Sequence, residues 1–144
     1  MAEIYRLQDF VEDATAIVAR RLPERETLQA LLPHLQRVIS RRDVLADMEP
    51  SGNPDPERGF TIYRAPDLSI HAVVWPENGG APVHNHNGWA IEGVISGRER
   101  NRNYQRLDDG SEPWRAKLEE VDPSVVSAGE TTDLGQVAMS PAAQ

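Results

Sequence analysis

Two histidines, His84 and His86, lie in the middle part of the chain with one residue between them. In an extended strand, side chains two positions apart point to the same face, so both imidazoles would face one point. Neutral imidazole is the commonest side-chain metal ligand, and it suits iron, zinc, copper and nickel. The alternative is a pair of exposed or hydrogen-bonded histidines on a loop. Because glycines and prolines flank the pair, as they flank short strands, we expect His84 and His86 to bind a metal ion.

Glu92 is the candidate third ligand. If the strand stays in register over Val83–Val94, the Glu92 carboxylate lies on the same face as His84 and His86. Two imidazoles and one carboxylate make a facial site with open positions, the arrangement used for non-haem Fe(II). A turn or bulge at Asn87-Gly88 would instead move Glu92 to the opposite face.

The composition indicates one acidic domain over residues 1–144. Fifteen Lys and Arg against 23 Asp and Glu give a net charge of −8, which argues against nucleic acid or an anionic membrane as a partner. The chain has no cysteine, and therefore no disulfide, thiolate ligand or cysteine nucleophile. No apolar run approaches the roughly 20 residues of a transmembrane helix, and the first residues are too polar for a signal peptide. We expect a cytoplasmic protein.

Residues 7–40 have the apolar spacing of helices. The first helical run has its apolar residues at Phe10, Val11, Ala14, Ile17 and Val18. Asp9 and Glu12 resemble a capping box at its start. Pro23 begins a second helical segment. Pro33 is expected to break that segment, because proline suits a first turn but not a helix interior.

After a proline- and glycine-rich loop at residues 49–59, the pattern becomes strand-like. Short runs of β-forming residues separated by turn residues lie at Phe60–Arg64, Leu68–Trp75, Val83–His86, Trp89–Ile95, Arg98–Leu107, Trp114–Val121 and Gly135–Met139. Asp108-Asp109-Gly110-Ser111 is a hairpin signal. Apolar and charged residues alternate from Trp114 onward, as in a half-buried strand. Short strands at this spacing favour a sandwich or barrel, so we predict a mainly β domain with a barrel over residues 60–144.

The segment Pro82–Glu99 resembles a metal-binding motif of the cupin superfamily. It is most similar to the thiol dioxygenase branch, which includes cysteine dioxygenase and 3-mercaptopropionate dioxygenase. That pattern runs from Pro-x-His-x-His through a tryptophan and Gly-Val to Gly-x-Glu. The likeness extends back over Tyr63–Leu68 to Trp75-Pro76, and the helical start of the chain also fits it.

The resemblance implies a cupin double-stranded β-helix, a small jelly-roll barrel, with an N-terminal helical segment. It implies a mononuclear Fe(II) held by three histidines, which binds a small thiol and O₂ and oxidises the sulfur to a sulfinic acid. The first two ligands correspond to His84 and His86. Tyr63 and Arg64 lie near the position of the family's arginine for a substrate carboxylate, and an arginine can hold that group bidentately. Arg98, beside the motif, is a further candidate for substrate binding.

The chain departs from the family after its second ligand. It lacks the cysteine that cysteine dioxygenase cross-links to a tyrosine, and no histidine follows His86. Residues 135–144 look like the strand that leads to the family's third histidine and to its Ser-His-Tyr relay. We therefore expect a barrel incomplete at the C-terminus and weak thiol oxidation by these residues alone. A metal-binding cupin without catalysis, and a Zn- or Mn-dependent isomerase or hydrolase on the same barrel, stay as alternatives.

Other candidate ligands and binding residues are weaker. His71 could supply a third ligand, but a histidine on its strand is more often hydrogen-bonded within the sheet. His34 lies among helical residues and is not expected to bind metal. The arginines at Arg98, Arg100, Arg102 and Arg106 alternate with polar residues, and we expect a solvated hairpin there because burying four arginines would cost too much desolvation. No residue is assigned a catalytic role from the sequence, and the substrate and a homodimeric state stay open.

Overall fold

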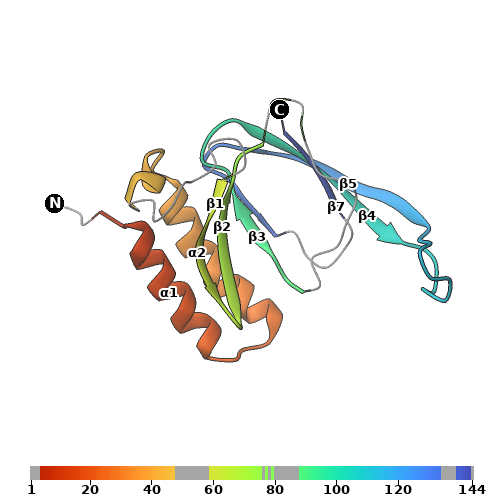
Figure 1. The fold of residues 1–144 in the computed structure, drawn as a ribbon, viewed down its shortest axis with the longest axis horizontal. Coiled ribbons are helices and arrows are strands. Elements are labelled where there is room, and N and C mark those ends of the chain that lie inside the picture. The colour runs from red at the N-terminus through yellow and green to blue at the C-terminus, as the bar shows by residue number, and fades with distance from the viewer. Residues whose placement is uncertain are drawn as a thin grey trace.

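The computed structural model describes residues 4–47, 59–75, 77, 79, 88–133 and 139–143. These residues form two helices followed by antiparallel strands (Figure 1). The helices are α1 (Leu7–Ala19) and α2 (Glu24–Ile39), followed by a short 3₁₀ turn, η1 (Val44–Asp47). The strands are β1 (Gly59–Ala65), β2 (Leu68–Val73), β3 (Ile91–Gly93), β4 (Arg98–Arg106), β5 (Leu118–Ser127), β6 (Thr131–Asp133) and β7 (Met139–Ala143).

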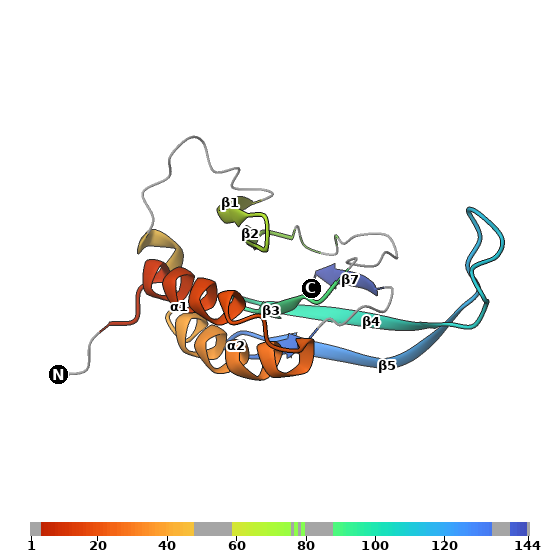
Figure 2. The ribbon, with the colours of Figure 1, turned by 90° about the horizontal axis from the view of Figure 1, so that it is seen from below.

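The hydrophobic core lies where the two helices pack on each other and on the strands. Helices α1 and α2 lie side by side in both ribbon views, and the β4–β5 hairpin extends away from them (Figure 2). The buried apolar side chains of α1 and α2 include Leu7, Phe10, Ala14, Ile17, Leu31, Val38 and Ile39. The 3.6-residue spacing of these positions puts them on one face of each helix, which is why residues 7–40 fold as the sequence predicts. Among the described residues, no helix combines the length and the apolar character needed to cross a membrane.

Two details of the helices correct the sequence prediction. Pro33 lies inside α2 and does not break it. The lost hydrogen bond would have gone to the carbonyl of Gln29, and because Pro33 and Gln29 are both exposed, water can take its place. Helix α1 begins at Leu7, one turn earlier than a cap at Asp9 requires. The Asp9 carboxylate instead accepts a hydrogen bond from the backbone N–H of Arg6 at 2.9 Å, so it serves as the reciprocal member of the cap.

The described strands form three small antiparallel sheets, and none of these closes into a barrel. Strand β1 pairs with β2, β3 with β6, and β4 lies between β5 and β7. The structure is thus a mixed α and β fold whose strands are all antiparallel, which agrees only in part with a mainly β domain. The predicted strand Val83–His86 lies outside the described residues, as does most of Gly135–Met139. Strand β3 is shorter than predicted, and β6 is a strand that the sequence pattern did not indicate.

The predicted strand at Trp114–Val121 is wrong at its start. Strand β5 begins at Leu118, and Trp114 lies in the loop before it, wholly exposed and with a φ of 67°. The Asp108 side chain organises this loop, because its carboxylate accepts hydrogen bonds from the backbone N–H groups of Gly110 at 2.8 Å and Lys117 at 2.5 Å. Turn chemistry therefore overrides the apolar alternation, and the hairpin turn itself lies where the sequence predicts it.

Candidate functional site

Of the three predicted metal ligands, the structure describes Glu92. It lies on β3, half buried, opposite Thr132 of β6 in the antiparallel ladder. His84 and His86 lie outside the described residues. The surroundings of Glu92 therefore define the part of the predicted site that can be built from the structure.

Glu92 meets two side chains from β4, which follows β3 along the chain and belongs to a different sheet. The Asn101 amide Nδ2 donates a hydrogen bond to Glu92 Oε1 at 3.1 Å. Glu99 is hydrogen-bonded to the Glu92 side chain and also to the side chain of Trp75, whose indole N–H is a donor only. These four side chains, from β3, β4 and the segment after β2, form one polar cluster. Hereafter Glu92, Glu99 and Asn101 are called the carboxyl–amide cluster.

The alternation of β4 explains why Glu99 and Asn101 face inward. Successive side chains on a strand point to opposite faces, and along β4 Glu99 and Asn101 are buried while Arg98, Arg100 and Arg102 are exposed. Glu99 is only 7% exposed and Asn101 only 1%. Strand β4 is also the central strand of its sheet, with β5 and β7 on either side, so its backbone is held from both edges.

The electrostatics of the cluster favour a protonated Glu99. Burial, followed by the hydrogen bond and the negative charge of Glu92, raises the pKa of Glu99 to about 8. The hydrogen bond from Trp75 acts the other way, because it stabilises the ionised form. Glu99 therefore retains its proton at neutral pH, beside the Glu92 side chain.

Two oxygens of this cluster have no hydrogen-bond partner in the described structure. They are Oε1 of Glu99 and Oδ1 of Asn101, and both atoms are fully buried. Buried polar atoms in native proteins nearly always have a partner, so the two oxygens mark a position where a further polar group would be accommodated.

The predicted substrate-binding residues lie on β1 and at the start of β4. Tyr63 is half buried and Arg64 exposed on β1, where they pair in register with Ile70 and Ser69 of β2. Arg98 is exposed at the start of β4. Within the described residues, no hydrogen bond or ion pair joins any of these side chains to Glu92.

The two described histidines have structural contacts. His71 is exposed on β2, and its Nδ1 lies 3.3 Å from Thr61 Oγ1 on the paired strand, in line with the expectation of a hydrogen-bonded residue. His34 lies on α2, where its Nδ1 is 3.2 Å from the Tyr5 hydroxyl and 3.4 Å from an Asp13 carboxylate oxygen. The Tyr5 hydroxyl donates to the same carboxylate at 2.5 Å, and burial together with Asp13 raises the pKa of Tyr5.

Within the described ranges, no three side chains of the histidine, cysteine, aspartate and glutamate types come together as a metal-binding group. No protein-family model matches the chain. The cupin resemblance therefore rests on the residues of the motif alone and stays a prediction.

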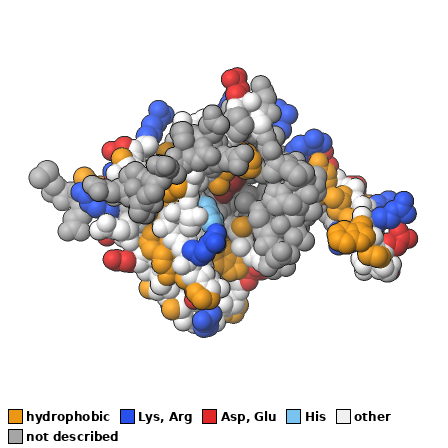
Figure 3. Space-filling view, in the orientation of Figure 1, with side chains coloured by type: hydrophobic (Ala, Val, Ile, Leu, Met, Phe, Trp, Pro, Cys, Tyr) orange, Lys and Arg blue, Asp and Glu red, His pale blue; other side chains and the backbone are white. Residues whose placement is uncertain are grey.

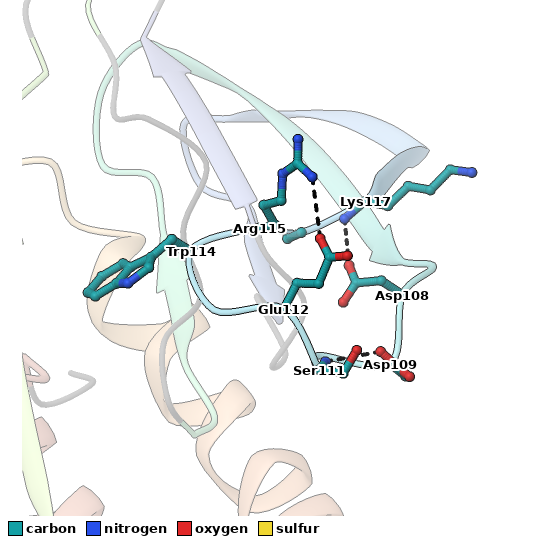
Figure 4. A pocket seen from close by; sticks show the side chains of 8 residues that line it. Asp108, Asp109, Ser111, Glu112, Trp114, Arg115 and Lys117 are labelled. Carbon is teal, nitrogen blue, oxygen red and sulfur yellow. Dashed lines mark hydrogen bonds and ion pairs between the residues drawn. The ribbon is translucent and has the colours of Figure 1, made fainter.

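A concave region lies at the tip of the β4–β5 hairpin (Figure 4). It is an open depression of about 500 Å³, lined by Asp108, Asp109, Ser111, Glu112, Trp114, Arg115, Ala116 and Lys117. The space-filling view shows hydrophobic and charged side chains of both signs mixed at this protruding end (Figure 3). Its carboxylates bind the loop itself: Asp109 accepts from the Ser111 backbone at 3.0 Å, and Glu112 pairs with Arg115 at 3.4 Å. The acidic residues of this depression therefore hold the conformation of their own loop.

Sequence reasoning missed Glu99 and Asn101. Both lie in a run of charged and polar residues that has no apolar face, so the run was interpreted as a solvated hairpin. The available signal was their spacing: they are two residues apart and therefore share a face, and the arginines all fall on the other face. The expectation of exposed arginines is confirmed for Arg98, Arg100, Arg102 and Arg106.

Proposed function

We propose that this chain is a non-haem iron oxidoreductase that oxidises a small thiol, of the cysteine or 3-mercaptopropionate type, to a sulfinic acid. The observation that carries the proposal is the position of Glu92. It follows the His84-x-His86 motif closely, is half buried, and has its carboxylate fixed by Asn101 at 3.1 Å. On this proposal the antiparallel strands belong to a cupin double-stranded β-helix, and the acidic, cysteine-free chain acts in the cytoplasm.

The donor groups fit an Fe(II) ion. Two imidazoles and a carboxylate are the ligand set of non-haem iron sites with open positions, and we propose His84, His86 and Glu92 as that set. Residues that hydrogen-bond a metal ligand fix its orientation, and Asn101 would do this for Glu92. When bound, the iron would supply adjacent positions for the thiol and O₂ together with the redox chemistry.

The remaining residues would shape the reaction space. Glu99 retains a proton beside Glu92, so the cluster carries less negative charge than two free carboxylates would. Asn101 is buried and its amide would hold the Glu92 carboxylate in place. We further propose that Tyr63, with Arg64 or Arg98, binds the carboxylate of an acidic thiol substrate, because a guanidinium matches a carboxylate bidentately.

The test is metal content combined with oxygen consumption. Iron-loaded protein is assayed with cysteine and with 3-mercaptopropionate, and O₂ uptake is compared with the sulfinate formed. We expect one sulfinate for each O₂ consumed, at a turnover below about one per second. His84→Ala and His86→Ala should each lose most of the iron, whereas His71→Ala, on an exposed strand position, should keep it.

Unchanged iron content in both motif variants would refute the metal site. Iron binding without sulfinate formation would refute the oxidation of these thiols and leave a metal-binding cupin. Tighter binding of zinc or manganese, with no oxygen uptake, would favour the isomerase or hydrolase alternative.

A further inference from the structure

The carboxyl–amide cluster has more acceptor oxygens than the described hydrogen-bond donors satisfy. Glu99 and Asn101 are more than nine-tenths buried, and each has an oxygen without a partner in the described part of the chain. The Asn101 amide nitrogen faces Glu92, because Nδ2 donates to Glu92 Oε1 at 3.1 Å, and the unpartnered atom of the amide is its oxygen. A buried unpartnered oxygen in a native protein needs a physical explanation, and here two of them occur on the same face of one strand.

A cation is the group that would satisfy these atoms together. Carboxylate and amide oxygens are the ligands that Mg²⁺, Mn²⁺ and Ca²⁺ prefer. Hydrogen-bond donors are scarce here: Trp75 donates to Glu99, and Asn101 donates to Glu92. The arginines of β4 are on the other face of the strand and exposed, so none of them neutralises the cluster.

We propose that Glu92, Glu99 and Asn101 bind one hard divalent cation, Mn²⁺ or Mg²⁺, through their carboxylate and amide oxygens. These ions are bound by one or two carboxylates and keep several water ligands, whereas Ca²⁺ takes six to eight oxygens. Glu92 is half buried and the other two residues are deeply buried, so water ligands would approach from the Glu92 side. The site requires no histidine, but it shares the Glu92 carboxylate with the proposed iron site, so the two ions would compete for that ligand.

The competing explanation is that the two carboxyl groups only share a proton. The two explanations differ in what Mn²⁺ does. A shared proton alone predicts no stoichiometric Mn²⁺ binding, and a cation site predicts about one ion per chain that depends on Glu99.

The experiment uses the full chain with His84→Ala and His86→Ala, so that the imidazoles cannot contribute a ligand. Mn²⁺ is titrated in, and binding is followed by loss of the sharp electron paramagnetic resonance signal of the free ion. We expect Glu99→Gln to weaken Mn²⁺ binding about tenfold or more, because the number of charged ligands sets the affinity of such sites. Glu119→Gln is the matched control, since Glu119 is an exposed carboxylate on the adjacent strand β5.

A second variant covers the case in which Glu99→Gln does not fold. Asn101→Asp adds a third carboxylate, so we expect it to bind Mn²⁺ more tightly than the parent and to melt at a higher temperature when Mn²⁺ is present. The proposal fails if the doubly substituted chain binds no Mn²⁺, if Glu99→Gln and Glu119→Gln bind it equally, or if Asn101→Asp gains neither affinity nor thermal stability. Mn²⁺ binding that is retained without the histidines and lost in Glu99→Gln would support the cation site, whether or not the parent chain binds iron.

Discussion

Gly93 offers the sharpest test of how the site strand is held against the helices. It follows Glu92 in β3 and packs on Ile39 of α2. A Cβ at Gly93 would lie 2.7 Å from Cδ1 and 2.9 Å from Cγ2 of Ile39, which is closer than carbon atoms approach without a shift. Ile39 is 5% exposed, so its side chain has little room to move. Gly93→Ala should therefore force the strand and the helix apart.

The expected magnitude comes from two opposing effects. The backbone of Gly93 is not in the positive-φ region, so alanine can adopt its conformation. Alanine lowers the conformational entropy of the unfolded chain, and this effect alone should stabilise the fold by about 0.4–1 kcal/mol. Overpacking a filled core costs about 1–3 kcal/mol. Because two atoms of a buried side chain are in contact, we expect the steric cost to prevail and Gly93→Ala to destabilise by about 1–2 kcal/mol.

A double-mutant cycle shows whether the cost is steric. Ile39→Val removes the Cδ1 atom of the closest contact and alone should cost about 0.5–1.5 kcal/mol. The combined variant should be more stable than the sum of the two single effects by about 0.5–1 kcal/mol. Urea denaturation followed by circular dichroism measures all four proteins. A Gly93→Ala protein as stable as the parent, or strictly additive effects, would refute the packing of β3 on α2.

Two other predictions concern charge and exposure. Hydrogen bonds from Arg41 hold the pKa of Asp47 below its ordinary value of 3.8, so the stabilisation by this carboxylate is present above that pH and is lost as the pH falls through the lower, folded value. In urea denaturation, Asp47→Asn should thus be less stable than the parent at pH 7 and nearly as stable as the parent at low pH. The control is Asp43→Asn, at an exposed position, which should have nearly the stability of the parent at both pH values. Trp114 is wholly exposed, so Trp114→Phe should remove the tryptophan fluorescence that iodide quenches most readily. It should change the free energy of unfolding by less than about 0.5 kcal/mol. Unchanged fluorescence quenching would contradict the exposure of Trp114.

The sequence predicts the helical part well because helices are encoded locally. The apolar stripe through Phe10 and Ile17 needs only the 3.6-residue period, and these side chains are buried as that period requires. Pro33 was misjudged because its effect depends on solvent access to the helix face, which is a property of the folded molecule. Strand β4 was found from its composition, but its buried face was not.

The spacing of Glu99 and Asn101 indicates that they share a face, but their burial could not be predicted from the sequence alone. Burial of Glu99 and Asn101 is favourable only with partners from other elements, and Glu92 and Trp75 come together with them only in the folded chain. The metal-ligand role of Glu92 and the substrate roles of Tyr63 and Arg64 stay predictions. For Trp114, local hydrogen bonds to Asp108 and Asp109 decide the conformation, and these compete with the strand that apolar alternation favours.

The central position of β4 has a consequence for the order in which the molecule is assembled. Strand β4 ends at Arg106, but its second partner, β7, begins at Met139. At about 5–20 residues per second, a ribosome needs several seconds to produce the intervening chain. During that time the strand that carries Glu99 and Asn101 has an open edge, and open edges pair readily with other strands. Charged side chains on an open edge disfavour its pairing with another strand, so the alternation that buries the polar cluster also places arginines where they guard the unfinished sheet.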